Sequence, residues 1–167
     1  MQAPTHILTG ILLLEVFRAI FTESPWWVHV IVVLPLAIAS HFLLDASSII
    51  TYHPPKADWK DWFWVSYHSL IYIASIALLV YFLVIDSWLW WVIIAANLPD
   101  IIDWLILRLI FKKEAVCHPI ADKLRNCLFK KTPNWNHKRW TVIIEFVIVG
   151  ILLTSVLLIQ KFITLAN

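Results

Sequence analysis

From Trp62 to Ile85 the chain contains no Asp, Glu, Lys or Arg. A helix needs about 20 consecutive apolar residues to cross the hydrocarbon core of a bilayer, so this stretch is a candidate transmembrane helix. Of the 167 residues in the chain, 61% are hydrophobic, 13 are Lys or Arg, and 11 are Asp or Glu. Soluble domains are about half apolar and about a quarter charged. The sequence therefore excludes an ordinary soluble domain and predicts an all-α membrane protein.

Five hydrophobic segments follow one another, separated by polar or Pro-containing connections. Most Trp residues fall at or near the segment ends, where indole rings rest among lipid headgroups. About five spans use most of the chain, which predicts a single transmembrane helical domain over residues 1–167. The expected segments are Thr5 to Phe21, Trp26 to Tyr52, Trp62 to Ile85, Trp88 to Phe111 and Trp140 to Phe162.

The basic residues are distributed unequally over the two sides of such a bundle. With five spans, the N-terminus and the connections 53–61 and 112–139 lie on one side, which carries eleven of the 13 Lys and Arg. Arg18 and Lys161 remain for the other side. Because cytoplasmic connections are enriched in Lys and Arg, we expect a cytoplasmic N-terminus. The net charge of +2 gives no indication of nucleic-acid binding.

The basic cytoplasmic loop, at about residues 112–139, contains a segment with amphipathic spacing. Between Pro119 and Lys131, apolar side chains fall on one helical face and basic side chains around the rest. Two interpretations stay open. The segment either lies on the anionic inner leaflet of the membrane or forms a solvated connector.

Several ionisable residues fall inside the hydrophobic segments. On insertion scales such a residue costs about 3 kcal/mol at the bilayer centre, so each one indicates a partner or a function. All five segments contribute at least one of these residues to the cytoplasmic half of the bilayer, which indicates a common site. Glu15 is the exception, closer to the middle. The residues are His6, Glu15, His41, Asp45, His68, Asp100, Asp103 and Glu145.

Helical spacing places these residues in pairs. His41 and Asp45 are four residues apart, and Asp100 and Asp103 three apart, so each pair shares one helix face. Ligands from facing helices form the metal sites of helical bundles, and carboxylates gathered in a low dielectric stay ionised when a cation lies between them. We therefore expect a divalent metal, zinc first, with manganese or iron as alternatives. The expected ligands are these four residues, with His6 as a fifth.

Two other interpretations of the same residues stay open. The first is a buried hydrogen-bonded network that orders helix packing, and the second is a relay for protons or ions. Pro99, which precedes Asp100, predicts a kink or break in the fourth segment near the expected site. His68 shares its helix with Tyr67 and is expected to pack or to support a ligand.

Further residues are candidates for catalysis and substrate binding. Glu145 could act as a general base for a metal-activated water, or it could pair with Lys138 or Arg139. His137 is the second candidate catalytic residue. Arg139, Lys138 and Lys56 are candidates to meet a substrate phosphate.

Three short motifs resemble those of a known family. They are Thr5-His6, the run Ser40 to Asp45, and the run Leu98 to Asp103. The family comprises the predicted inner-membrane metal-dependent hydrolases of bacteria, the LexA-regulated membrane hydrolase type, with an early Thr-His and the motifs L-P-D-x-D-H, H-R-G-x-T-H-S and H-x-L-L-D. The resemblance implies hydrolase activity, a bacterial inner-membrane location and a distant similarity to the zinc-dependent phospholipase C fold.

The chain departs from the family pattern in three ways. Asp45 precedes Asp100, so the motif order is permuted. The second acid of the Leu-Pro-Asp motif is one residue further on, and Trp104 stands where the family has His. The run from Asn136 to Thr141 matches H-R-G-x-T-H-S only faintly.

The leading functional interpretation is a membrane-embedded metal-dependent hydrolase. Its substrate would be a lipid or phosphoester at the cytoplasmic leaflet, with the bilayer as the surrounding partner. The alternatives are a transporter in which the same carboxylates carry protons or metal ions, and a noncatalytic membrane scaffold.

Overall fold

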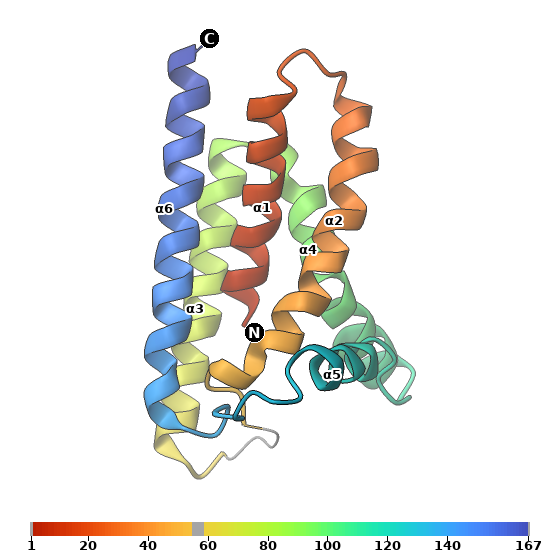
Figure 1. Cartoon of the computed structure of the whole chain (residues 1–167), viewed down its shortest axis with the longest axis vertical. Helices are drawn as coiled ribbons and strands as arrows, with labels where there is room; N and C mark the ends of the chain where they lie inside the picture. Colours follow the sequence, from red (N-terminus) through yellow and green to blue (C-terminus); the bar gives the residue numbers. More distant parts are fainter. Residues whose placement is uncertain (1, 55–58, 167) are drawn as a thin grey trace.

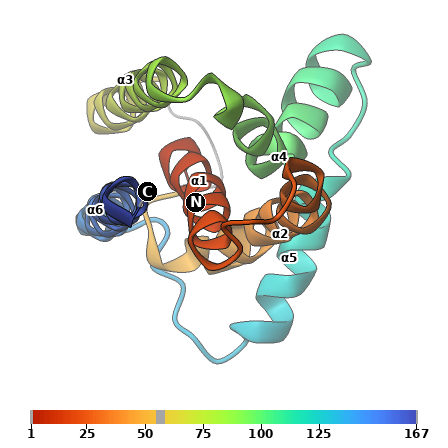
Figure 2. The same ribbon diagram turned by 90° about the horizontal axis from the view of Figure 1, so that it is seen from above.

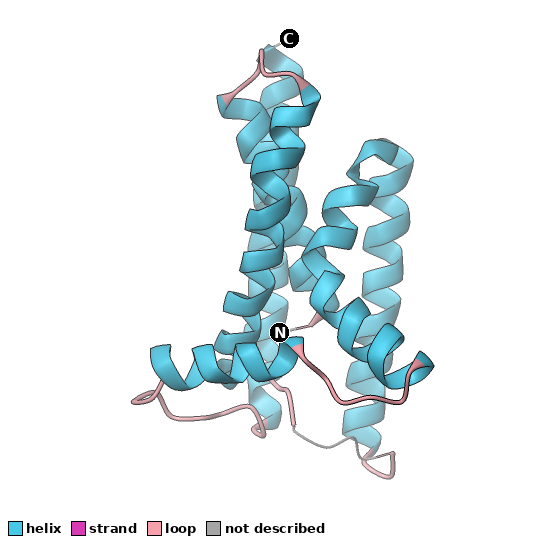
Figure 3. Cartoon of the chain, turned by 90° about the vertical axis from the view of Figure 1, so that its right-hand side faces the viewer, coloured by secondary structure: helices cyan, strands magenta, loops and turns pink. Residues whose placement is uncertain are grey.

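The computed structural model describes residues 2–54 and 59–166. The described residues form helices and connecting loops without strands, which confirms the all-α expectation (Figures 1 and 3). One element, η3, is a π-helix, and η1, η2 and η4 are short 3-10 helices. In chain order the elements are α1 (Ala3–Ile20), α2 (Trp26–Ala46), η1 (Ser47–Ile50), α3 (Trp62–Ile85), η2 (Ser87–Leu89), α4 (Trp90–Asp100), η3 (Ile101–Ile110), α5 (Cys117–Leu128), η4 (Arg139–Thr141) and α6 (Val142–Ala166).

Four of the described helical stretches are long and apolar enough to cross a membrane. This is consistent with a multi-pass membrane protein. The fourth segment expected from the sequence is divided between α4 and η3. The four stretches are Ala3–Ile20, Trp26–Ile50, Trp62–Ile85 and Arg139–Leu165.

The irregularity expected at Pro99 is a change of helix type. The α-helix α4 ends at Asp100, one residue after Pro99, and the chain continues as the π-helix η3. Proline has no N–H to donate and its ring crowds the carbonyl four residues back, so the α-helical pattern is disturbed there. Wider π turns occur frequently at functional sites. Here the change lies between Asp100 and Asp103, and it sets the direction of both carboxylates.

Helix α1 lies at the centre of the bundle. It packs against α2, α3, α4 and α6, and Figure 2 shows it surrounded by these helices. Its residues Ile7, Leu8, Ile11 and Leu14 are at most 5% exposed and belong to the main apolar core. A central α1 brings His6, near its start, close to α2 and α4.

Aspartate side chains cap the start of α3 and the start of the short helix η2 that follows it. The side chain of Asp61 accepts the Phe63 N–H at 3.0 Å, and that of Asp86 accepts the Trp88 N–H at 2.9 Å. These contacts satisfy N–H groups that have no partner within a helical turn. The turn at Asp86 reverses the chain, so α4 returns toward the end of the bundle where α3 begins (Figure 1).

Gly10 marks the closest approach of α1 to α4, and we predict that Gly10→Ala destabilises the bundle. A Cβ at this position would lie 2.7 Å from the Ala96 Cβ and 3.1 Å from the Val92 carbonyl oxygen. Overpacking of this kind costs about 1–3 kcal/mol. In the matched control, Gly150→Ala in α6, the new Cβ meets nothing within 4 Å. Unfolding in mixed micelles would measure both, and equal stability of the two variants would contradict this packing.

Candidate metal centre

Five side chains from four helices converge at the N-terminal end of α1. Helix α1 contributes His6, α2 contributes His41 and Asp45, α4 contributes Asp100, and α5 contributes His118. They form two groups that each fit a metal ion, and Asp45 belongs to both. Within each group one ligand atom per residue lies within 4.8 Å of the others: His6, His41 and Asp45 in the first, and Asp45, Asp100 and His118 in the second.

Asp45 holds the two groups together. Its Oδ1 lies 3.2 Å from His6 Nε2, and its Oδ2 lies 3.3 Å from His41 Nε2 and 3.9 Å from His118 Nε2. Asp100 Oδ1 closes the second group at 3.3 Å from His118 Nε2. A carboxylate with one oxygen toward each of two ligand groups can serve one ion or bridge two.

The histidines in the first group direct buried ring nitrogens toward Asp45, at 3.2 Å for His6 and 3.3 Å for His41. His41 donates its Nδ1–H to the Ala96 carbonyl at 2.7 Å, which leaves the lone pair on Nε2. His41 Nε2 and both ring nitrogens of His6 are buried, and in the described part of the chain none of them makes a hydrogen bond of good geometry. Buried polar atoms without such a bond are costly. A cation in contact with these nitrogens would remove that cost, so the donor set fits a metal.

Asp103 orients the His118 ring and is not itself a member of the two ligand groups. Its Oδ2 accepts the His118 Nδ1–H at 2.6 Å, so Nε2, which faces Asp100 and Asp45, is the ring nitrogen that would bind a metal once it has lost its proton. The carboxylate also accepts the backbone N–H groups of Val116, Cys117 and His118 at 2.7–2.9 Å. Asp103 therefore caps the start of α5 and fixes the ring that α5 carries. Carboxylates support metal-binding histidines in this way in many metalloproteins.

Helix α5 is tied to α2, which positions His118 from the other side. The Arg125 guanidinium donates to the Asp45 backbone carbonyl at 2.9 Å and to Ser48 Oγ at 3.0 Å. Ala121, one turn after His118, is buried where α5 packs on α2. Figure 1 shows α5 lying across the end of the bundle, below α2 and α4.

We predict that Asp103→Asn weakens zinc binding about 10–100-fold, the usual effect of removing an outer partner of a ligand. An amide at this position no longer stabilises the Nδ1–H tautomer of His118 through a charge. Asp122→Asn is the matched control on α5, because Asp122 is 59% exposed and pairs only with Arg125 among the contacts found. A competition titration with a zinc-binding dye measures both affinities. Equal zinc affinities of the two variants would show that Asp103 does not support the metal centre.

The protonation of His118 predicts that metal binding depends on pH. The hydrogen bond to Asp100, aided by that to Asp103, raises the pKa of His118 to about 9 in the metal-free protein. A metal ligand must be deprotonated, so below pH 9 binding releases this proton. Apparent affinity then rises about tenfold per pH unit up to pH 9. Calorimetry at pH 7.5 in buffers of different ionisation enthalpy counts the protons released, and no release would contradict the assignment.

Of the five ligands predicted from the sequence, the structure brings His6, His41, Asp45 and Asp100 together and adds His118. Asp103 instead contacts His118 from behind the ligand positions. His118 lies in a loop that was expected to be cytoplasmic, and its neighbours Cys117 and Cys127 lack the spacing of a structural zinc site. One feature of the sequence could have indicated that this loop contributes to the site: Asp103 follows Asp100 on a helix that must end near the loop. Sequence spacing alone does not show that α5 folds back onto α2.

Glu145 is not among the ligand groups around Asp45. It is fully buried, and its Oε1 accepts the backbone N–H of Gln2 at 3.2 Å and the hydroxyl of Thr5. Gln2 is the residue immediately before α1 and Thr5 lies in its first turn, where backbone N–H groups have no helical partner. In the structure Glu145 therefore anchors the start of α1, a position that does not favour the expected role as general base or the expected pairing with Lys138 or Arg139.

The other expected catalytic and phosphate-binding residues lie outside the ligand cluster. His137 is exposed in the loop before η4. Arg139 is 62% exposed and pairs with Asp61 at 2.9 Å. Lys138 contributes its backbone to the turn that starts η4. Lys56 lies outside the described residues.

A pocket of about 460 Å³ leads to the cluster. Asp45, Asp100 and His118 line it together with residues of α3 and of the 53–54 segment. Exposure increases toward this pocket: the His6 side chain is 0% exposed, that of Asp45 13%, and that of Asp100 35%. The cluster is therefore buried on the α1 side and open on the side of α4 and α5.

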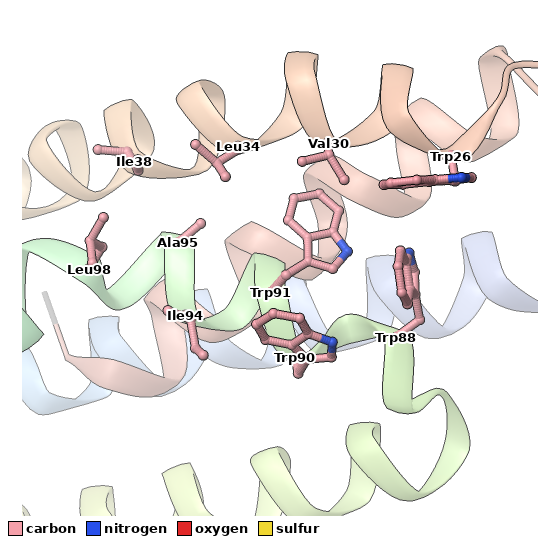
Figure 4. Close-up of a pocket in the computed structure, with 10 residues that line it drawn as sticks. All are labelled: Trp26, Val30, Leu34, Ile38, Trp88, Trp90, Trp91, Ile94, Ala95 and Leu98. Carbon is pink, nitrogen blue, oxygen red and sulfur yellow. The ribbon is translucent and has the colours of Figure 1, made fainter.

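A second pocket of about 370 Å³ lies between α2 and α4 (Figure 4). Trp26 and Trp88 stand at one end of it, and Ile38 and Leu98 at the other. Its walls contain no ionisable side chain among the described residues. It is an apolar groove with no groups for chemistry.

No protein-family model, no curated protein and no solved structure matches this chain. The family resemblance of the short motifs therefore remains a resemblance, and the functional assignment depends on the geometry of the centre.

Proposed function

We propose that the chain is a membrane-embedded, metal-dependent hydrolase whose substrate is a lipid or phosphoester at the cytoplasmic leaflet. The observation that carries the proposal is the convergence of His6, His41, Asp45, Asp100 and His118 around shared positions, with buried nitrogens of His6 and His41 at 3.2 and 3.3 Å from the Asp45 carboxylate. One or two divalent ions, zinc first, would be held there. Manganese and iron are the alternatives for this mixed imidazole and carboxylate set.

The proposed orientation places the centre near the cytoplasmic surface. We propose five spans, with α4 and η3 together as the fourth, and a cytoplasmic N-terminus. Support comes from the basic residues, since the connections 53–61 and 112–139 carry most Lys and Arg. The family resemblance adds a bacterial inner membrane to this proposal.

The chemistry proposed for the centre is hydrolysis of an ester. A bound divalent cation would supply Lewis acidity, polarising the ester and acidifying a water molecule. His68, in the pocket lining, donates its Nδ1–H to the Trp64 carbonyl at 2.8 Å and stacks on the Trp64 ring at 4.1 Å. Its Nε2 lone pair is therefore available in the pocket as a proton acceptor. Gln2 donates to His53 Nδ1 at 3.3 Å, which leaves an Nε2–H on His53 to donate to a substrate oxygen.

The transporter alternative has less support. A second polar cluster lies toward the opposite end of α1, where Glu15 meets Arg18 at 3.5 Å and Gln160 at 2.9 Å. Between His6 and Glu15, however, the inward face of α1 consists of apolar residues of the main core. A conduction path needs a continuous series of polar groups between its sites, whereas Thr9 is the one polar side chain of α1 between these two.

The test is hydrolysis by the purified protein in vesicles of phosphatidylethanolamine and phosphatidylglycerol. The expected result is release of a water-soluble headgroup fragment that stops after chelation and resumes on addition of zinc. Zinc uptake into sealed vesicles, with no release of fragments, would favour the transporter. Neither release nor uptake, in a protein that does not bind metal, would leave the scaffold interpretation.

A further inference from the structure

The pocket that leads to the metal centre has two chemically different parts. Its polar part consists of Asp45, Asp100 and His118, with His53 and His68 in the same lining. Apolar and aromatic side chains complete the same cavity, and they belong to the facing elements α3 and η3: Trp64, Ile71, Tyr72 and Trp104. A cavity with charged and apolar parts side by side fits an amphiphilic molecule better than a fully water-soluble one.

The apolar part faces a seam between α3 and α4–η3. Helix α3 packs on α1 and meets the following segment through the short η2 turn, but the described residues form no extended contact between α3 and α4 or η3. Figure 2 shows α3 and α4 on the same side of α1 and separated from each other. Tyr72 on α3 is 66% exposed and Trp104 on η3 is 54% exposed, and both line the cavity.

We infer that the seam between α3 and α4–η3 is a lateral entrance from the bilayer, and that Tyr72 and Trp104 hold the hydrocarbon chain of a lipid substrate. The substrate's polar ester would then lie against Asp45, Asp100 and His118 while its chain stays among the membrane lipids. This inference rests on the proposed hydrolase function and specifies its substrate class, a membrane lipid with a headgroup ester.

Physical chemistry favours entry through the membrane over entry through water. Each methylene group that leaves the bilayer loses favourable free energy, so a lipid that slides sideways into a site avoids the loss. The ester group must meanwhile leave the headgroup region, and it needs polar partners inside the protein. The cavity supplies those partners from Asp45, Asp100 and His118 and places the apolar and aromatic side chains of Ile71, Tyr72 and Trp104 beside them.

The groove between α2 and α4 is the alternative place in which the hydrocarbon chain of the lipid could lie. It is also apolar and open, with Trp90 and Leu98 among its lining residues (Figure 4). However, Leu98 and Asp100 are two residues apart on one helix, so they project to nearly opposite sides of α4. A hydrocarbon chain in that groove would be separated by α4 from the pocket that Asp100 lines.

The test reversibly blocks the two proposed positions of the lipid chain, at residues 72 and 104. Tyr72→Cys and Trp104→Cys are labelled with benzyl methanethiosulfonate, which adds a bulky group through a disulfide that a reductant removes. Tyr81→Cys on α3 and Trp90→Cys on α4 are the matched controls, because Tyr81 is 46% and Trp90 52% exposed and neither lines the pocket. The wild type, which has Cys117 and Cys127, is treated in parallel.

Labelling at 72 or 104 is expected to slow hydrolysis of phosphatidylglycerol in vesicles at least about tenfold. The label displaces the lipid's hydrocarbon chain, which then no longer aligns the ester with Asp45, Asp100 and His118. The reductant restores the rate, which shows that the protein remained folded. Labels at 81 and 90 are expected to change the rate little. Native mass spectrometry should also show fewer retained lipids after labelling at 72 or 104.

Two failures are distinguishable. If the wild type hydrolyses lipid but labels at 72 and 104 leave the rate unchanged, or if the label at 90 slows it, the lateral entrance is wrong and the hydrolase proposal stands. If the unlabelled wild type neither binds zinc nor hydrolyses phosphatidylglycerol, the proposed function fails, and the inference that depends on it is overturned with it.

Discussion

Asp45→Asn is expected to lower zinc affinity by more than about a hundredfold, a larger effect than the 10–100-fold typical of residues behind the ligands. Asp45 is the only residue in both ligand groups found in the described part of the chain. Asparagine has a similar shape but no charge, and its amide cannot place an anionic oxygen toward both groups. Hydrolysis should be lost together with the metal.

The measurement is a zinc competition titration, combined with thermal unfolding in detergent with and without zinc. Glu23→Gln is the matched control, an exposed acid in the loop between α1 and α2. Because a ligand stabilises the state that binds it, zinc should raise the melting temperature of the wild type and of Glu23→Gln but not that of Asp45→Asn. If Asp45→Asn lowers stability while zinc has no effect on any of the three proteins, Asp45 belongs to a structural network.

His118→Ala is expected to produce the second large effect, loss of most zinc affinity with the helical bundle intact. His118 Nε2 lies 3.3 Å from Asp100 and 3.9 Å from Asp45, and α5 lies across the end of the bundle outside its main core. Removing the ring takes away one ligand without creating a cavity among the spanning helices. Alanine also abolishes the proton release expected at pH 7.5.

His137→Ala is the matched control for this variant. Both histidines lie between η3 and η4, but His137 is exposed and is not among the residues that group around Asp45. Zinc affinity and headgroup release should be unchanged in His137→Ala and strongly reduced in His118→Ala. The opposite ranking would return His137 to the site and exclude His118.

The fold and most of the ligand set could be predicted because lipid imposes simple rules on a sequence. Backbone groups in a bilayer must pair within helices, so apolar length predicts the helices. Charged groups are rare there, so His41, Asp45 and Asp100 are conspicuous. The i, i+4 spacing of His41 and Asp45 correctly places both on the face toward His6, where Asp45 contacts both rings.

The remaining parts of the site depend on long-range packing. Asp103 was expected as a ligand because it shares a helix face with Asp100, but η3 is a π-helix, in which residues three apart no longer superpose as in an α-helix. Its carboxylate instead meets the start of α5. His118 enters the site because Arg125 ties α5 to α2 over 80 residues of sequence. Glu145 pairs with the residue before α1 over a separation of 143 residues, a contact that no local pattern indicates.

The account's central claim, that these residues form a metal centre, is tested most directly by the metal content of the purified protein. The protein is prepared in detergent without chelators, and its metals are measured by inductively coupled plasma mass spectrometry beside the double variant Asp45→Asn with Asp100→Asn. We predict at least one equivalent of a divalent transition metal per wild-type chain, zinc first, and almost none in the double variant. Near-zero metal in both proteins, with no uptake from added zinc, would contradict the account.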